Sequence, residues 1–204
     1  MTPIFKFEGI YTPVVTPYQE DGRVNWDALS QVIEYLIEAG IHGLISGGST
    51  GENYAQTVDE RLELARFTHK QLDGRLPLVV GTGAMLTEDS VALASGAREL
   101  EAAAILLASP PYSVPTDREN ALNALAIDKA ADLPIMLYNY PHRTGTMMGE
   151  EFLDRVGRSR QHTYKFLIIR IGLCFISSKT TCWGVKMARS DMSDLEWEFI
   201  KAVL

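Results

Sequence analysis

Hydroxyl, phenol and guanidinium side chains gather in four polar segments of the sequence, each directly after a short apolar run. The segments are GGSTGE at Gly47–Glu52, GTGA at Gly81–Ala84, SPPYSVP at Ser109–Pro115 and YNYPHRTG at Tyr138–Gly145. A glycine-rich turn that carries hydroxyls suits a bound carboxylate, and a phenol can both donate and accept a hydrogen bond during proton transfer. The alternative is that each segment is only a strand-to-helix turn, which needs small residues.

Five apolar runs must position these segments, and stretches with helical periodicity separate the runs. They lie at Tyr11–Val15, Gly43–Ser46, Pro77–Val80, Ala104–Ala108 and Ile135–Tyr138. The repeat length is roughly 30 residues, the size of one βα unit. Thr57 with Glu60 and Thr116 with Glu119 have the spacing of a helix capping box. The sequence therefore predicts strands and helices in alternation.

The apolar runs are continuous rather than alternating, which predicts parallel strands covered by helices. Two architectures fit this pattern, a βα barrel and an open doubly wound sheet. The polar segments would all lie at one end of the sheet, and a barrel builds its active site from several strand ends around one mouth. A doubly wound sheet typically has a GxGxxG turn after its first strand, whereas the first run here ends TPVVTPY. We therefore predict an α/β fold of the (β/α)8 TIM-barrel type.

The bulk properties limit the possible partners. The chain has 204 residues and a formal net charge of −7, and no basic run is present that could bind a nucleic-acid backbone. No apolar stretch is long enough to cross a membrane, and the start MTPIFKFEGIYTP is unlike a signal peptide. We expect a cytoplasmic protein without nucleic-acid or membrane partners. Cys174, Cys182 and the scattered histidines show no metal-ligand spacing, so no metal is expected.

The polar segments resemble those of the dihydrodipicolinate synthase and N-acetylneuraminate lyase family. Its members are class I aldolases that condense or cleave pyruvate through a lysine Schiff base inside a (β/α)8 barrel. The similarity runs from about Gly9 to Arg160 and includes GIYTPVVTPY, GGSTGE with ERLELAR, VVGTGA, ASPPYSVPT and LPIMLYNYPHRTG, in family order and at family spacing. The resemblance implies pyruvate or another 2-oxo acid as the small-molecule substrate, a homo-oligomer, and no cofactor.

The resemblance also implies roles for five residues. Ser49 and Thr50 would bind the pyruvate carboxylate, and Tyr138 would pass protons beside the Schiff base. Ser49 and Tyr112 would join Tyr138 in a hydroxyl relay, and family members borrow the residue that matches Tyr112 from a neighbouring subunit. Arg143 would hold a carboxylate of the second substrate. The serine of GGSTGE is more typical of the sialic acid lyases, but the RTG ending is more typical of the synthases, which we favour.

The family chemistry requires a lysine on the sixth strand, where burial lowers its pKa so that a neutral amine can attack the keto group. The sequence in this region reads QHTYKFLIIRIGLCF. Phe166 falls at the expected position of the lysine, and Lys165 comes one residue early. Because neighbouring side chains on a strand point to opposite faces, Lys165 is expected to face the helix layer unless the strand slips by one residue.

The end of the sequence departs from the family pattern. We divide the chain into a partial TIM barrel over residues 1–160 and a non-matching tail over residues 161–204. One strand-like run at Phe166–Ile176 and one helical run at Ser193–Leu204 cannot supply the missing barrel units. We therefore expect an incomplete barrel of about five to six βα units with exposed strand edges, as in a truncated or frame-shifted product.

The leading hypothesis is a Schiff-base lyase or synthase that condenses pyruvate with an aldehyde such as aspartate semialdehyde, or cleaves a 2-oxo acid aldol. The first alternative is a catalytically inactive, truncated family member that only binds a 2-oxo acid or pairs with a full-length relative. The second is an unrelated phosphate-binding α/β protein. That protein would need a Lys–Ser or Lys–Thr after the glycines, which GGSTGE lacks.

Overall fold

The strands form one sheet, and all but the last run parallel. The structure is a computed structural model that describes residues 7–157 and the backbone of residues 164–167 and 174–176. The strands are β1 Gly9–Pro13, β2 Gly43–Ser46, β3 Leu78–Gly81, β4 Ala104–Ala108, β5 Ile135–Tyr138, β6 Tyr164–Leu167 and β7 Cys174–Ile176. Their order in the sheet is β6-β5-β4-β3-β2-β1-β7. Neighbours from β1 to β6 pair in parallel, and β7 pairs antiparallel with β1.

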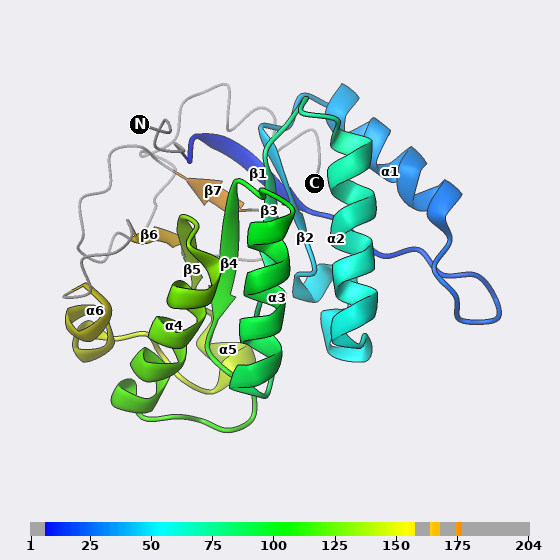
Figure 1. Ribbon diagram of the computed structural model, residues 1–204. Coiled ribbons are helices and arrows are strands. Elements are labelled where there is room, and N and C mark those ends of the chain that lie inside the picture. Colours follow the sequence, from blue (N-terminus) through cyan, green and yellow to red (C-terminus); the bar gives the residue numbers. More distant parts are fainter. Residues whose placement is uncertain (1–6, 158–163, 168–173, 177–204) are drawn as a thin grey trace.

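Helices follow each of the first five strands. They are α1 Trp26–Glu38, α2 Val58–Leu72, α3 Thr87–Glu99, α4 Asp117–Ala131, α5 Pro141–Thr144 and α6 Glu150–Gly157, with the 3-10 turns η1 Ser49–Gly51 and η2 Asn53–Ala55 between β2 and α2. Figure 1 shows α2, α3 and α4 side by side against one face of the strands. The βα alternation predicted from the sequence is therefore confirmed.

The two faces of the sheet carry different cores. Leu44, Leu107 and Leu137 belong to the cluster that packs against the helices, together with buried residues such as Leu64 and Ile127. A second cluster contains the alternate strand residues and covers the opposite face; its members are Phe7, Tyr11, Ile45, Val79, Ala104, Leu106 and Met136. Within the described part of the chain this second face has no helix layer. It corresponds to the interior of a barrel.

The strand order confirms an incomplete barrel of the (β/α)8 type. From β1 to β6 each strand lies beside its predecessor in the sequence. A doubly wound sheet instead reverses its strand order at a switch point and carries helices on both faces. The doubly wound alternative is therefore wrong. Right-handed crossovers that always return to the same side produce a curved half-barrel, in which all loops after β1 to β5 lie at one end.

Both predicted capping boxes are present. The Glu60 amide donates to Thr57 Oγ1 at 3.3 Å, and the Thr57 amide donates to Glu60 Oε2 at 2.7 Å. Thr116 and Glu119 repeat the arrangement at 3.3 and 2.9 Å. Each box satisfies two backbone groups that would otherwise lack a partner in the first helical turn. The start of α2 and of α4 is thus fixed by local sequence.

Strand boundaries agree with the sequence prediction where the strand lies between two parallel neighbours. The limits of β2, β4 and β5 match those predicted, and β3 is shifted by one residue. The first strand was predicted at Tyr11–Val15 but occupies Gly9–Pro13. Its outer neighbour β7 pairs with Gly9–Tyr11, and this partner, far away in sequence, sets where the strand begins.

The tail differs from expectation at one point. The predicted single strand over Phe166–Ile176 is wrong, because the structure has two strands there, β6 and β7. The edges of the sheet within the described residues are β6 and β7, because β7 covers the outer edge of the first strand. β7 supplies antiparallel partners to that edge and so occupies backbone groups that would otherwise be open to another chain. The predicted helix at Ser193–Leu204 lies outside the described residues.

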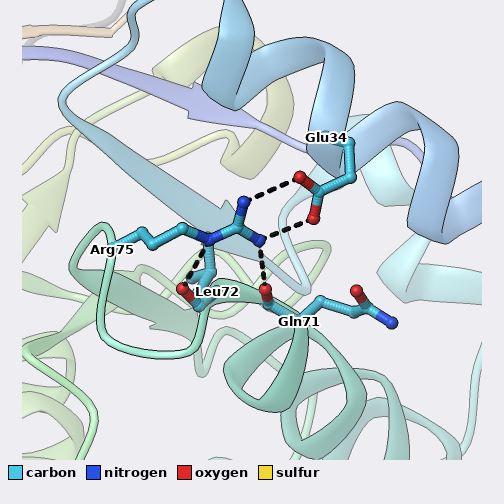
Figure 2. A network of polar contacts seen from close by, with 4 residues as sticks. All are labelled: Glu34, Gln71, Leu72 and Arg75. Carbon is cyan, nitrogen blue, oxygen red and sulfur yellow. Dashed lines mark hydrogen bonds and ion pairs between the residues drawn. The ribbon is translucent and has the colours of Figure 1, made fainter.

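One ion pair connects α1 to the end of α2, as Figure 2 shows. The Arg75 guanidinium donates to both carboxylate oxygens of Glu34, at 2.6 and 2.7 Å. It also donates to the carbonyls of Gln71 and Leu72, at 2.6 and 3.2 Å, and so satisfies acceptors at the end of α2. The hydrogen bonds from Arg75 lower the pKa of the Glu34 carboxyl. These two parallel hydrogen bonds, the Arg75 fork, link the first and second βα units.

Candidate functional site

The five predicted site residues all lie at the carboxyl ends of parallel strands or in the segments that follow them. Ser49 and Thr50 form the start of η1 after β2, and Tyr112 lies in the loop after β4. Tyr138 is the last residue of β5, and Arg143 belongs to the short helix α5 behind it. In a barrel-type sheet these positions surround one mouth. The structure thus brings the predicted elements to the same end of the sheet.

The turn that contains Ser49 and Thr50 is held in place by hydrogen bonds to its last residue, Gly51. The Gly51 carbonyl accepts hydrogen bonds from Thr16 Oγ1 and from Gln56 Nε2, both at 2.8 Å. Ser49 is half-buried and Thr50 is exposed. In a turn held in this way, hydroxyls and backbone N–H groups are suitable donors to a small anion.

A buried arginine connects this turn to the next loop. Arg61, on the first turns of α2, is only 5% exposed. Its Nη2 donates to the carbonyls of Gly81 at 2.8 Å and Gly47 at 3.4 Å, and its Nη1 donates to the carbonyl of Gly83 at 3.0 Å. The Gly47 carbonyl also accepts from Asn53 Nδ2 at 3.0 Å. One guanidinium therefore joins the ends of β2 and β3.

The environment of Arg61 is unusual for a buried cation. Its hydrogen-bond acceptors are backbone carbonyls, and no ion pair to it occurs among residues 7–157. Burial lowers the pKa of Arg61 to about 10, while the Asp89 carboxylate acts in the opposite direction. The guanidinium stays charged at neutral pH and contributes positive potential behind the GGSTGE turn.

Gly81 allows the two loops to meet. A Cβ placed on Gly81 would lie 2.3 Å from the Gly47 carbonyl oxygen, closer than any real contact of that kind. Gly47 itself has a φ of +72°, a conformation that glycine adopts without strain. Gly47 and Gly81 thus serve backbone geometry.

Around β5, two tyrosine rings and a guanidinium lie close together. The rings of Tyr138 and Tyr140 are 5.8 Å apart, and the Arg143 guanidinium lies 5.9 Å from the Tyr140 ring centroid. The Tyr140 ring therefore lies close to both Tyr138 and Arg143, and no role for Tyr140 was predicted from the sequence. Asn139 closes the following loop, since its Oδ1 accepts from the Met148 amide at 3.0 Å.

Tyr112 stands apart from the other site residues of its own chain. Its side chain is 87% exposed, and its backbone has a φ of +69°. Non-glycine residues adopt this left-handed conformation rarely and usually at a cost of about 1–3 kcal/mol, which the surroundings must offset. The loop starts from a fixed point, because buried Asn120 donates to the hydroxyl of buried Ser109 at 2.8 Å.

The register of β6 differs from the one inferred from residue spacing. Lys165 pairs with Met136, and Phe166 pairs with Leu137. Met136 belongs to the cluster on the interior face, whereas Leu137 belongs to the cluster that packs on the helices. The backbone pairing therefore aligns Lys165 with an interior residue and not, as expected, with a helix-facing one. Register between parallel strands depends on the intervening connection, which spacing alone does not specify.

Arg61 is the main site-supporting residue that the sequence analysis overlooked. It lies within ERLELAR, yet no role was given to it. A signal was available, because Arg61 shares one helix face with the buried residues Leu64, Ala65, Thr68 and Leu72. An arginine at an apolar-face position close behind a capping box indicates a buried polar function.

The described residues contain no group of three or more potential ligands that could hold a metal ion. None of the helices within that part of the chain is long and apolar enough to cross a membrane.

Comparison with protein families places most of the chain in one group. Residues 6–161 match the model of the dihydrodipicolinate synthetase family. The 4-hydroxy-tetrahydrodipicolinate synthase of Pseudomonas putida (strain W619) is 36% identical over 148 residues, which cover 72% of this chain and 51% of that protein. The chain thus spans about half the length of the curated relatives it matches.

Solved structures give the same result. A chloride-inhibited dihydrodipicolinate synthase from Acinetobacter baumannii, complexed with pyruvate, has a TM-score of 0.75 and 30% identity, covering 80% of this chain and 56% of that one. A prophage protein of the dihydrodipicolinic acid synthase family from E. coli K12, also in complex with pyruvate, has a TM-score of 0.72 and 30% identity, covering 76% and 52%.

Proposed function

This chain belongs to the dihydrodipicolinate synthetase family, and from that premise we propose that it acts on pyruvate as a Schiff-base lyase or synthase. The observation that carries the proposal is the placement of Ser49, Thr50, Tyr138 and Arg143. All four lie at or directly after the carboxyl ends of parallel strands within the family-matching segment. Two structural relatives that carry pyruvate, from Acinetobacter baumannii and E. coli K12, support the choice of substrate.

Binding would begin at the GGSTGE turn. Ser49 and Thr50 would donate hydrogen bonds to the pyruvate carboxylate, with the charge of buried Arg61 behind the turn adding to the attraction for an anion. The keto carbon would then lie between this turn and Tyr138 at the end of β5. We assign this site to residues 1–160 and give the tail, residues 161–204, the task of supplying the amine.

The reaction would proceed through an imine. A neutral lysine amine adds to the keto carbon, and the resulting carbinolamine loses its hydroxyl as water after a proton arrives through Tyr138. Loss of a methyl proton gives an enamine, whose carbon attacks the carbonyl carbon of an aldehyde such as aspartate semialdehyde. Water then hydrolyses the new imine and releases the lysine. Arg143 would hold the carboxylate of that second substrate.

The candidate nucleophile is Lys165. Its support is the pairing with Met136, which aligns it with the interior side of β5 two residues before Tyr138. The proposal is tested by incubating the protein with pyruvate and sodium borohydride and measuring its intact mass. We expect one pyruvate-derived adduct, and peptide mapping should place it on Lys165.

Two lysine variants make this test specific. Lys165→Arg keeps the positive charge but cannot form an imine, so the adduct should disappear. Lys129→Arg on the exposed side of α4 should leave it unchanged. An adduct that survives in Lys165→Arg would move the nucleophile to another lysine. A wild-type protein that pyruvate stabilises thermally but borohydride leaves unmodified would be a 2-oxo acid binder without the chemistry.

The proposed site is completed by a second copy of the chain. Tyr112 is 87% exposed on a loop with left-handed backbone geometry, which is compatible with a residue donated to a neighbouring subunit. It would enter the hydroxyl relay of Ser49 and Tyr138 in that subunit. A homo-oligomer is therefore part of the proposal.

A further inference from the structure

Arg61 donates no hydrogen bond to Ser49 or Thr50, but it binds the backbone at the start of the turn that carries them. Its guanidinium donates to the carbonyls of Gly47, Gly81 and Gly83. Gly47 precedes Ser49 by two residues, so a shift of its carbonyl must be transmitted to the turn. Arg61 therefore fixes where the turn begins.

Three features make this contact depend on an arginine in a fixed geometry. Arg61 is only 5% exposed, and a buried cation is stable only where its donors find acceptors. The planar fork lets Nη1 and Nη2 reach carbonyls from two different strands, a geometry that a single ammonium lacks. The absence of a Cβ at Gly81 lets the Gly47 carbonyl approach, so both loops depend on the same junction.

We propose that Arg61 is a positioning residue that sets the affinity of the GGSTGE turn for the carboxylate of a 2-oxo acid. The inference rests on the proposed function, because it assumes that this turn receives the carboxylate. Arg61 acts through Gly47 and makes no contact with substrate. Its effect is on substrate binding and not on the proton transfers that Tyr138 is proposed to perform.

The test uses the conservative variant Arg61→Lys, which retains the charge and removes the fork. Pyruvate binding is measured by isothermal titration calorimetry, with Arg66→Lys on the exposed face of the same helix as matched control. We expect the Kd for pyruvate to rise about 10- to 100-fold in Arg61→Lys, the equivalent of one lost hydrogen bond to a charged group. Arg66→Lys should bind like the wild type.

A kinetic measurement separates positioning from catalysis. With pyruvate and borohydride, Arg61→Lys should need a higher pyruvate concentration for half-maximal adduct formation, while the rate at saturation stays at the wild-type value. A lower melting temperature with an unchanged Kd would mean that Arg61 only stabilises the fold, and this would overturn the inference.

A third measurement needs no ligand. Amide hydrogen exchange at Gly48–Gly51 should be faster in Arg61→Lys than in the wild type and in Arg66→Lys. Unchanged exchange would show that Arg61 does not hold the turn, whatever the binding data. Wild-type protein that fails to bind pyruvate, combined with faster exchange in Arg61→Lys, would instead overturn the proposed substrate and leave the role of Arg61 in holding the turn intact.

Discussion

At the scale of single residues, the mouth of the sheet depends on a close approach between the backbones of Gly47 and Gly81. Gly81 is required by a neighbouring carbonyl rather than by its own backbone conformation. The Gly47 oxygen occupies the space where a Cβ would lie, and the same oxygen accepts a hydrogen bond from Arg61. A change at either residue should therefore disturb the same peptide.

Gly81→Ala tests this junction. We expect the variant to lose about 1–3 kcal/mol of unfolding free energy, because an added methyl in a tightly packed site forces the backbone to move. Urea denaturation measures the loss. Gly48→Ala is the control, since a Cβ at Gly48 meets no atom within 4 Å and its φ of −82° suits alanine. Equal stability of Gly81→Ala and the wild type would contradict the packing seen here.

Tyr138→Phe tests the proposed proton transfer without changing the packing of the ring. If the hydroxyl passes protons during imine formation, the rate of borohydride-trapped adduct should fall about 10²- to 10⁴-fold, the usual contribution of a positioned acid or base. Tyr140→Phe, whose ring lies beside that of Tyr138, serves as the control and should retain most of the rate. A wild-type rate in Tyr138→Phe would remove the phenol from the mechanism.

At the scale of elements, helix α2 is the part that carries the positioning arginine. Its first turn is fixed by the Thr57–Glu60 capping box, and Arg61 follows directly. Thr57→Ala should destabilise the protein by about 1 kcal/mol, the typical cost of a lost N-cap. It should also weaken pyruvate binding, because the start of the helix places the guanidinium. Thr57→Ser keeps the cap oxygen and should behave like the wild type in both thermal melting and calorimetry.

The contact between α1 and α2 predicts a dependence of stability on pH. Hydrogen bonds from Arg75 lower the pKa of Glu34 in the folded state. The stabilisation is therefore fully present above the unfolded-state pKa of this glutamate and is lost as the pH falls through the folded-state pKa. The difference in melting temperature between the wild type and Glu34→Gln should be largest at neutral pH and shrink in acid.

A comparison with Glu38→Gln, on the exposed last residue of α1, controls for the loss of a negative charge. A gap between the wild type and Glu34→Gln that stays constant from neutral to acidic pH would contradict the role of the Arg75 fork.

At the scale of the whole molecule, the proposed site needs two chains. If Tyr112 serves the neighbouring subunit, a mixture of Tyr112→Phe and Tyr138→Phe proteins that exchange subunits should form adduct faster than either variant alone. Sites that combine the intact Tyr138 of one chain with the intact Tyr112 of the other would account for the gain. Adduct formation no faster in the mixture would place Tyr112 in its own subunit or outside the relay.

How much of this could be read from the sequence depends on the distance over which each feature is determined. The capping box at Thr57 and the limits of β2 are local, and sequence periodicity predicted both. The shift of β1 depends on a partner that is remote in the chain, and its predicted limits were wrong. The backbone pairing of Lys165 depends on the connection between β5 and β6, and the face that its side chain takes stays a prediction. The position of Arg61 on an apolar helix face indicated burial, but its acceptors are backbone carbonyls at the ends of other strands, which no residue type reveals.

The pairing of β7 with β1 also affects how the molecule folds. Tyr11 and Cys174 lie opposite each other although they are separated by most of the chain, whereas the neighbours from β1 to β5 are joined by single helical crossovers. Contacts of such high sequence separation carry a large loop-closure entropy and slow the rate-limiting step. We therefore expect the βα units to assemble in sequence order and the pairing of β7 with β1 to form after them. Until then the amino-terminal edge is open to the chaperones and neighbouring chains that a nascent protein meets.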